Sequence, residues 1–221
     1  MKVCTDACIL GAYAAQLAAE DNQISRCLDI GAGTGLLSLM IAQRSAAIID
    51  AIDIDINAFE EGNNNFNSSP WSKRLHYIHS DVISYHPNDT YDLIFTNPPF
   101  YEKELQSPHH FKNIARHDDG LTLQELAIAI DRNLSSAGKF ILLLPFQRVD
   151  EFEEIATRLL FHLHTKISIR HSNHHPYSRV VMIFSRESTS PSIHELIIKD
   201  ESNNYTPNFN SLLKDYYLLL D

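Results

Sequence analysis

Residues 29–35 read Asp29-Ile30-Gly31-Ala32-Gly33-Thr34-Gly35 and contain three of the seven glycines in this chain of 221 residues. A short apolar run at 26–30 precedes the glycines, and an apolar segment with helical character follows at 36–43. Because glycine has no side chain, a backbone rich in it turns tightly and approaches a ligand closely. The stretch therefore predicts a strand, a ligand-contacting loop and a helix, in that order.

The rest of the chain alternates between strand and helix. We expect strands at 26–30, 48–52, 75–78, 91–96, 139–144, 162–169 and 179–184, and helices at 7–19, 36–43, from about 57, 121–134, 152–160 and 209–220. This alternation predicts an α/β domain over 1–221, with a mostly parallel sheet and helices on both faces. Residues 172–176 have turn composition and leave no room for a crossover helix, so the last two strands should form an antiparallel hairpin.

Composition excludes several classes of protein. Apolar residues make up 44% and charged residues 21%, which excludes a disordered chain and a coiled coil. There is no apolar run of about eighteen residues, so we expect no membrane association, and no signal peptide is recognisable. Three cysteines without a CxxC pair (Cys4, Cys8 and Cys27) indicate reduced thiols and a cytoplasmic protein. A net charge of −10 argues against a nucleic-acid coat protein but allows a local basic patch.

The glycine spacing distinguishes two kinds of nucleotide loop. A dinucleotide fingerprint is G-x-G-x-x-G, whereas here the third glycine comes one residue early. With Asp29 two residues before Gly31, the pattern resembles the loop that binds S-adenosylmethionine. This resemblance implies cofactor contacts from Asp29, Gly31, Gly33 and Gly35; a glycine-rich turn without a ligand is the alternative.

Acidic residues follow the next two predicted strands. Asp53 ends an apolar strand about twenty residues past the loop, where a carboxylate can accept hydrogen bonds from both ribose hydroxyls. Asp55 stands at a predicted helix start, so we assign it to helix capping. The methyltransferase pattern implies that Asp81 accepts from the adenine amine of the cofactor; a loop or cap aspartate is the alternative.

The predicted strand at 91–96 ends in Asn97-Pro98-Pro99-Phe100. Two successive prolines cannot continue a central strand, so this segment should be a rigid loop at a strand end. The side-chain oxygen of Asn97 and the carbonyl of Pro98 offer two acceptors to the two N–H donors of an exocyclic amine. Hydrogen bonds from both hydrogens raise electron density on the nitrogen, which then attacks the methyl group in line and displaces the sulfonium sulfur of the cofactor. Phe100 stacks on the planar substrate. A simple Asn-Pro turn is the alternative.

The glycine loop and Asn97-Pro98-Pro99-Phe100 together resemble the amino-methyltransferases with an Asn-Pro-Pro-aromatic signature. That resemblance implies the class I methyltransferase (Rossmann-like) fold, S-adenosylmethionine as cofactor and a planar sp2 nitrogen as methyl acceptor. It also implies that Asn97 contacts the cofactor as well as the substrate amine. Segments 1–6, 10–13, 27–37, 69–71 and 204–218 further resemble the bacterial tRNA(Val) adenine-N6 methyltransferase family, which implies N6-methylation at tRNA position 37. A protein glutamine amide or an rRNA guanine amine is the alternative substrate.

The same resemblance places Thr5 and Asp6 near the methionine part of the cofactor; a helix N-cap is the alternative. Two features depart from the family. Cys4 stands where the family usually has glycine, and the family usually continues upstream of the residue that matches Met1.

An acidic enzyme needs a local site for tRNA. Two clusters of basic residues flank the expected sheet edge and contain the candidate phosphate contacts: Lys103, Lys112, Arg116, Arg170 and Arg179. A solvated loop with incidental charge is the alternative for each cluster. The twelve histidines lack metal-site spacing, so we expect no metal. The oligomeric state is not predicted.

Overall fold

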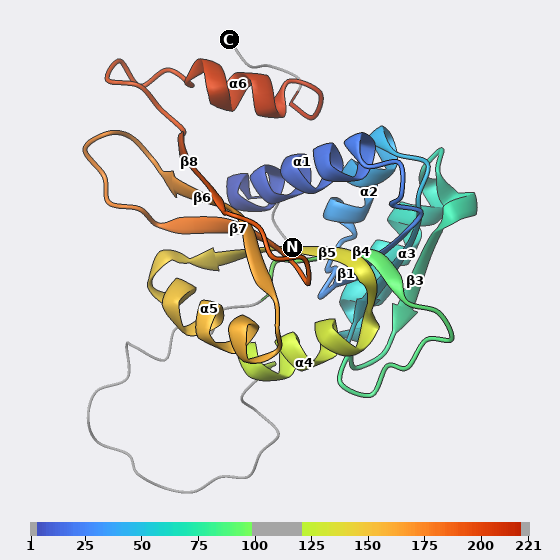
Figure 1. Cartoon of the computed structure of the whole chain (residues 1–221). Helices are drawn as coiled ribbons and strands as arrows, with labels where there is room; N and C mark the ends of the chain where they lie inside the picture. Colours follow the sequence, from blue (N-terminus) through green and yellow to red (C-terminus); the bar gives the residue numbers. More distant parts are fainter. Residues whose placement is uncertain (1–3, 99–120, 218–221) are drawn as a thin grey trace, which may run out of the picture.

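The computed structural model describes residues 4–98 and 121–217 of the chain (Figure 1). The helices are α1 (Thr5–Glu20), α2 (Leu36–Arg44), α3 (Ile56–Ser68), α4 (Leu123–Asn133), α5 (Val149–Arg158) and α6 (Pro207–Leu213), with short 3-10 helices η1 (Ser72–Arg74) and η3 (Phe146–Arg148). The strands are β1 (Arg26–Ile30), β2 (Ile48–Asp53), β3 (Leu75–His79), β4 (Tyr91–Thr96), β5 (Leu134–Pro145), β6 (His162–Arg170), β7 (Arg179–Ser185) and β8 (Ser192–Ile197).

All eight strands form one sheet in the order β3-β2-β1-β4-β5-β7-β6-β8. The first five strands of this order are parallel, and β7 runs antiparallel to both β5 and β6. The expected parallel sheet with an antiparallel hairpin is therefore confirmed. β8 was not expected from the sequence; it pairs parallel with β6 at the edge of the sheet.

Helices cover both faces of the sheet, as Figure 1 shows for α1 and α2 on one side and α4 and α5 on the other. Alternate residues of β5 enter different cores. Ile141 and Leu143 pack in the core beneath α1, α2 and α6, whereas Phe140 and Leu142 pack in the core with α4 and α5. A strand buried on both faces reads as a continuous apolar run, which is why β5 was recognisable in the sequence.

Two helix starts follow ordinary capping chemistry. Thr122 and Glu125 form a reciprocal capping box at the start of α4, and the Asp55 side chain caps α3 by accepting from the Asn57 amide. The capping role expected for Asp55 is thereby confirmed. No helix in the described ranges combines enough length and apolar character to span a bilayer.

The order of the strands reverses between β1 and β4, which are hydrogen-bonded neighbours. The chain progresses from β1 toward β3 on one side and from β4 toward β5 on the other. In open parallel sheets, ligands bind beyond the carboxyl ends of the strands at such a switch point. The glycine loop after β1 and Asn97 after β4 both start there.

Candidate active site

The glycine loop after β1 is held by three neighbouring elements. The amides of Gly31 and Ala32 donate to the carbonyl oxygen of Ile52 at 2.9 and 3.1 Å. The Tyr77 hydroxyl of β3 donates to the Gly33 carbonyl at 2.6 Å, and the Asn65 side chain of α3 donates to the Thr34 carbonyl at 2.9 Å. The loop is therefore fixed by the fold before any ligand binds.

Glycine is required in this loop for two reasons. Gly31 has a φ of 70°, and a Cβ built on it meets no described atom within 4 Å, so its surface faces open space. Gly35 has a φ of 77°, and a Cβ there would clash with the ring of Phe66. Gly31 thus presents bare backbone to a ligand, whereas Gly35 allows α2 to start close to α3.

Asp29 lies beneath the loop and is completely buried. Its Oδ2 accepts a hydrogen bond from the Ser38 hydroxyl at 2.8 Å, while Oδ1 has no partner within the part of the chain that the structure describes. Burial raises the pKa of Asp29 to about 7, although the hydrogen bonds from Ser38 oppose the shift. A buried acceptor without a partner is costly, so this atom fits a ligand that brings a donor or a positive charge.

Asp53 and Asp55 have different partners: Asp55 caps α3 as predicted, and the ribose contact of Asp53 stays a prediction. Oδ2 of Asp53 accepts from the Gly33 amide and Oδ1 accepts from the Asp55 amide, both at 2.9 Å. Each carboxylate oxygen has a second lone pair, so Asp53 can still accept from ribose hydroxyls. The contact with Gly33 is an additional role in fixing the loop that spacing alone did not reveal.

Asp81 lies in the turn after β3, where its Oδ1 accepts from the Ile83 amide at 2.9 Å. The loop-aspartate role is thus present, and the adenine contact stays a prediction. The sequence reading missed two apolar neighbours, Ile54 and Ile83, whose side chains are 68% and 44% exposed. A signal for them was present in the sequence: Ile54 directly follows Asp53, and Ile83 comes two residues after Asp81. At such strand ends, surface residues are usually polar. Two such side chains can line a site for a flat ring.

The corner that contains Asn97 is adjacent to the glycine loop. Thr96, the last residue of β4, pairs with Ile30, the last residue of β1, and its hydroxyl donates to the Ile30 carbonyl at 2.8 Å. Gly31 and Asn97 therefore follow directly on neighbouring strands. Asn97 is partly exposed and Pro98 is buried, as expected for a rigid loop that presents one polar side chain.

Thr5 and Asp6 form the first turn of α1. The residue before them, Cys4, stands at the N-cap position, so Thr5 is inside the helix and is not its cap. The Thr5 side chain hydrogen-bonds to Tyr217, and Asp6 forms an ion pair with Arg179 at 3.3 Å. The start of α1 is thereby tied to the C-terminal segment and to the start of β7.

The predicted RNA-contacting residues fall into two groups. Arg170 and Arg179 lie at the hairpin ends of β6 and β7, and each is paired with an acid: Arg170 with Glu195 at 2.8 Å and Arg179 with Asp6. The predictions for Phe100, Lys103, Lys112 and Arg116 concern residues outside the described ranges. The described residues bring together no cluster of three or more His, Cys, Asp or Glu that could hold a metal ion.

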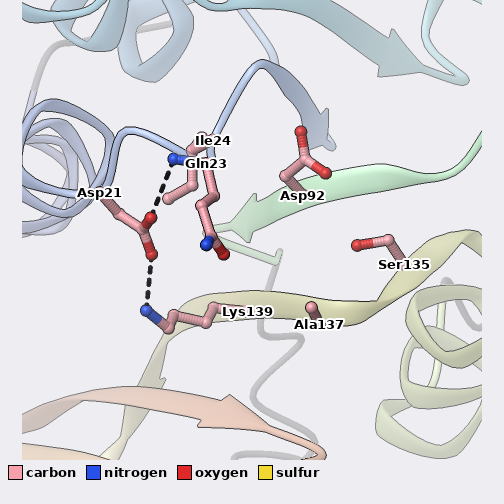
Figure 2. A pocket seen from close by; sticks show the side chains of 7 residues that line it. All are labelled: Asp21, Gln23, Ile24, Asp92, Ser135, Ala137 and Lys139. Atoms are coloured by element: carbon pink, nitrogen blue, oxygen red, sulfur yellow. Dashed lines mark hydrogen bonds and ion pairs between the residues drawn. The ribbon is translucent and has the colours of Figure 1, made fainter.

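A small pocket of about 70 Å³ lies at the other end of the sheet, near the amino ends of β4 and β5 (Figure 2). Figure 2 shows Asp21 bonded to the Gln23 amide and to Lys139, while Asp92, near the amino end of β4, lies across the pocket. Small-molecule sites usually exceed about 300 Å³, so this pocket is too small for a nucleoside cofactor. The strand ends at the switch point remain the candidate site.

This sheet topology, with a glycine loop and an Asn-Pro corner at its switch point, defines a class I S-adenosylmethionine-dependent methyltransferase. Residues 13–142 match the family model of the methyltransferase small domain. The chain belongs to the family of tRNA1(Val) (adenine(37)-N6)-methyltransferases. It is 41% identical to the Dyadobacter fermentans member over 99% of this chain and 91% of that protein, and 37% identical to the Aliivibrio salmonicida member with the same coverage.

Solved structures agree on the fold. A protein of Agrobacterium tumefaciens described as a predicted O-methyltransferase aligns with a TM-score of 0.72 at 16% identity, over 95% of this chain and 96% of that one. A Listeria monocytogenes protein described as a putative class I S-adenosylmethionine-dependent methyltransferase aligns with a TM-score of 0.65 at 12% identity. It covers 97% of this chain and 72% of that one. The expected methyltransferase fold is therefore confirmed.

Proposed function

We propose that this chain transfers a methyl group from S-adenosylmethionine to the exocyclic N6 of an adenine in tRNA, at position 37 of tRNA1(Val). The observation that carries the proposal is the register of β1 and β4: Ile30 pairs with Thr96 at the switch point, and Gly31 and Asn97 are the residues that follow them. The names of relatives at 35–41% identity over nearly the whole chain support the substrate. The described strands form one sheet and Thr5 is hydrogen-bonded to Tyr217, which supports the assignment of residues 1–221 to one methyltransferase domain.

Three sets of residues would hold the cofactor. Asp53 accepts from the ribose hydroxyls, and Asp81 accepts from the adenine amine. The exposed Ile54 and Ile83 would supply apolar contacts for the adenine ring. Asp29, whose buried Oδ1 has no partner among the described residues, would serve the methionine end together with Thr5, Asp6 and the bare backbone of Gly31, Gly33 and Gly35.

The chemistry requires positioning more than strong acid or base groups. Bound S-adenosylmethionine supplies an electrophilic methyl group. The Asn97 side-chain oxygen and the Pro98 carbonyl accept hydrogen bonds from the two N–H groups of the adenine amine. These bonds orient the nitrogen and raise its electron density. Asn97 and Pro98 are thus the catalytic residues among those described, and Phe100 would stack on the adenine.

The RNA contacts follow from charge. Lys103, Lys112 and Arg116 would bind phosphates, together with Arg170 and Arg179. A guanidinium has five N–H donors, so an ion pair with Glu195 or Asp6 leaves donors for a phosphate oxygen.

Nucleoside analysis of methylated RNA tests the proposal. The chain is incubated with methyl-labelled S-adenosylmethionine and, in parallel, with total tRNA, rRNA and a protein extract. We expect label in N6-methyladenosine from tRNA, mapped to position 37 by fragment analysis, with an Asn97→Ala protein as the blank. Label confined to a protein glutamine or to an rRNA guanine would replace the tRNA assignment by one of those alternatives.

A further inference from the structure

An aromatic pair lies at the carboxyl edge of the sheet, outside the site described above. Phe146 follows β5 in η3, and Tyr177 precedes β7. Their rings are stacked with centroids 5.3 Å apart and planes inclined by 24°. Phe146 is 38% exposed and Tyr177 is partly exposed, and neither ring belongs to either hydrophobic core as the structure describes them.

The pair is held in place by polar contacts and not by burial. The Phe146 amide donates to the Ser178 carbonyl at 3.1 Å, which joins the two segments. The Arg170 guanidinium lies 5.3 Å from the centroid of the Tyr177 ring, and the Tyr177 hydroxyl donates to Glu195. Arg170 also pairs with Glu195, so Phe146 and Arg170 both contact the Tyr177 ring, and Phe146 presents the more exposed ring surface of the pair.

The pair follows the same end of the sheet as the methyl-accepting corner. Thr96 pairs with Leu142 on β5, so Asn97 is level with Leu143, and Phe146 lies three residues further along. At about 3.3 Å per residue, this offset is roughly 10 Å along the strand direction. A nucleotide next to one bound at Asn97 reaches that far.

We propose that Phe146 and Tyr177 form a stacking platform for an unpaired base adjacent to the methylated adenine. This inference rests on the proposed function, because it specifies how the same site holds its RNA. Proteins recognise single-stranded RNA loops mainly by stacking splayed bases on aromatic rings, with Arg adding a cation–π contribution. The combination of an exposed ring pair and the Arg170 guanidinium matches that chemistry.

A base fits this surface better than an apolar protein partner does. Phe146 is 38% exposed, and its neighbours Gln147 and Ser178 are exposed and polar. A protein-binding surface would need a contiguous apolar patch of a few hundred Å². A single planar ligand needs only one ring face and a nearby cation.

The test uses an anticodon stem-loop carrying 2-aminopurine at either neighbour of the target adenine, with S-adenosylhomocysteine present to prevent turnover. We expect quenching of one of the two probes by the wild-type protein and recovery of its fluorescence in Phe146→Ala. With tRNA as substrate, Phe146→Ala should raise KM roughly tenfold with kcat within about twofold, which is the size of one lost base–ring contact. Phe146→Tyr should restore the wild-type KM.

Ile128→Ala, at a 47% exposed apolar residue on α4, is the matched control and should leave KM and quenching unchanged. If the wild type is active and Phe146→Ala has the same KM and the same quenching, the stacking platform is overturned and the proposed function is not. A loss of S-adenosylhomocysteine affinity equal to the loss of RNA affinity would also overturn it, because the effect would then be structural. A wild type that methylates no tRNA overturns the proposed function itself, and the wild-type assay shows this separately.

Discussion

The buried hydroxyl of Thr96 donates a hydrogen bond to the carbonyl oxygen of Ile30 across 2.8 Å. These two residues end β4 and β1, and the two loops that carry the cofactor and the methyl acceptor start directly after them. One side-chain bond therefore connects the halves of the site, in addition to the backbone ladder between the strands.

Replacing Thr96 by Val removes this bond while keeping the shape of the side chain. We expect the free energy of unfolding to fall by about 1 kcal/mol, the usual net value of one hydrogen bond. A small shift between the two loops should also lower kcat, because methyl transfer depends on alignment. Urea unfolding and single-turnover methyl transfer measure the two effects, with Thr96→Ser, which keeps the hydroxyl, as the control. A Val variant with wild-type kcat would show that the bond has no positioning role.

Asn97→Ala should separate catalysis from cofactor binding. We expect kcat to fall by about 10²- to 10³-fold, as for the loss of one positioned group that stabilises developing charge. The dissociation constant for S-adenosylmethionine should stay within about twofold, because the main partner of Asn97 is the substrate amine. Calorimetric titration gives the cofactor affinity and single-turnover assays give the rate. Equal losses in both measurements would mean that Asn97 contacts the cofactor instead.

Asp53→Ala and Asp55→Ala should differ although the residues are two apart. Asp53→Ala removes the predicted ribose acceptor and the anchor of the Gly33 amide, so we expect cofactor affinity to fall at least about tenfold. Asp55→Ala removes a helix cap and should cost about 1 kcal/mol of stability with little change in affinity.

A cofactor analogue that lacks both ribose hydroxyls distinguishes the two roles of Asp53. If the ribose contact dominates, the analogue should bind wild type and Asp53→Ala with similar affinity. A full tenfold difference between the two proteins with this analogue would assign the whole effect to the Gly33 anchor.

Much of the fold was predictable because the central strands are buried on both faces and therefore read as apolar runs. β8 was missed for the opposite reason: four of its six residues, beginning at Ser192, are exposed, and Leu196 is its one buried residue. An edge strand of this kind has little periodicity to recognise. The final helix was also predicted too long, since α6 ends at Leu213.

The strand-end motifs of the site were predictable because each is a contiguous stretch of sequence. The partners of the arginines were not, because Glu195 and Asp6 reach Arg170 and Arg179 only through the fold. The basic cluster that contains Arg170 and Arg179 therefore suggested more positive charge at the β6–β7 hairpin than the folded structure has. The burial of Asp29 likewise depends on packing between β1 and α2.

Asp29 gives the apo protein a distinctive pH dependence. Its folded-state pKa, raised to about 7 by burial, lies above the unfolded value near 3.9, so the folded protein holds a proton that the unfolded chain has released. The stabilising contribution of the protonated group is complete below about pH 4 and is lost as pH rises toward 7, at up to about 1.4 kcal/mol per pH unit. As the pH rises between these limits, the free energy of unfolding should fall less for Asp29→Asn than for the wild type, because the amide does not ionise.

Thermal unfolding of both proteins from pH 4 to 8 measures this difference directly. The Tm of wild type minus that of Asp29→Asn should decrease with rising pH and level off above about pH 7. S-adenosylmethionine carries positive charge, so saturating cofactor should favour the ionised carboxylate and flatten the difference for wild type. Parallel Tm curves without cofactor would mean that Asp29 is ionised throughout this range, and its unpartnered oxygen would then need a different explanation.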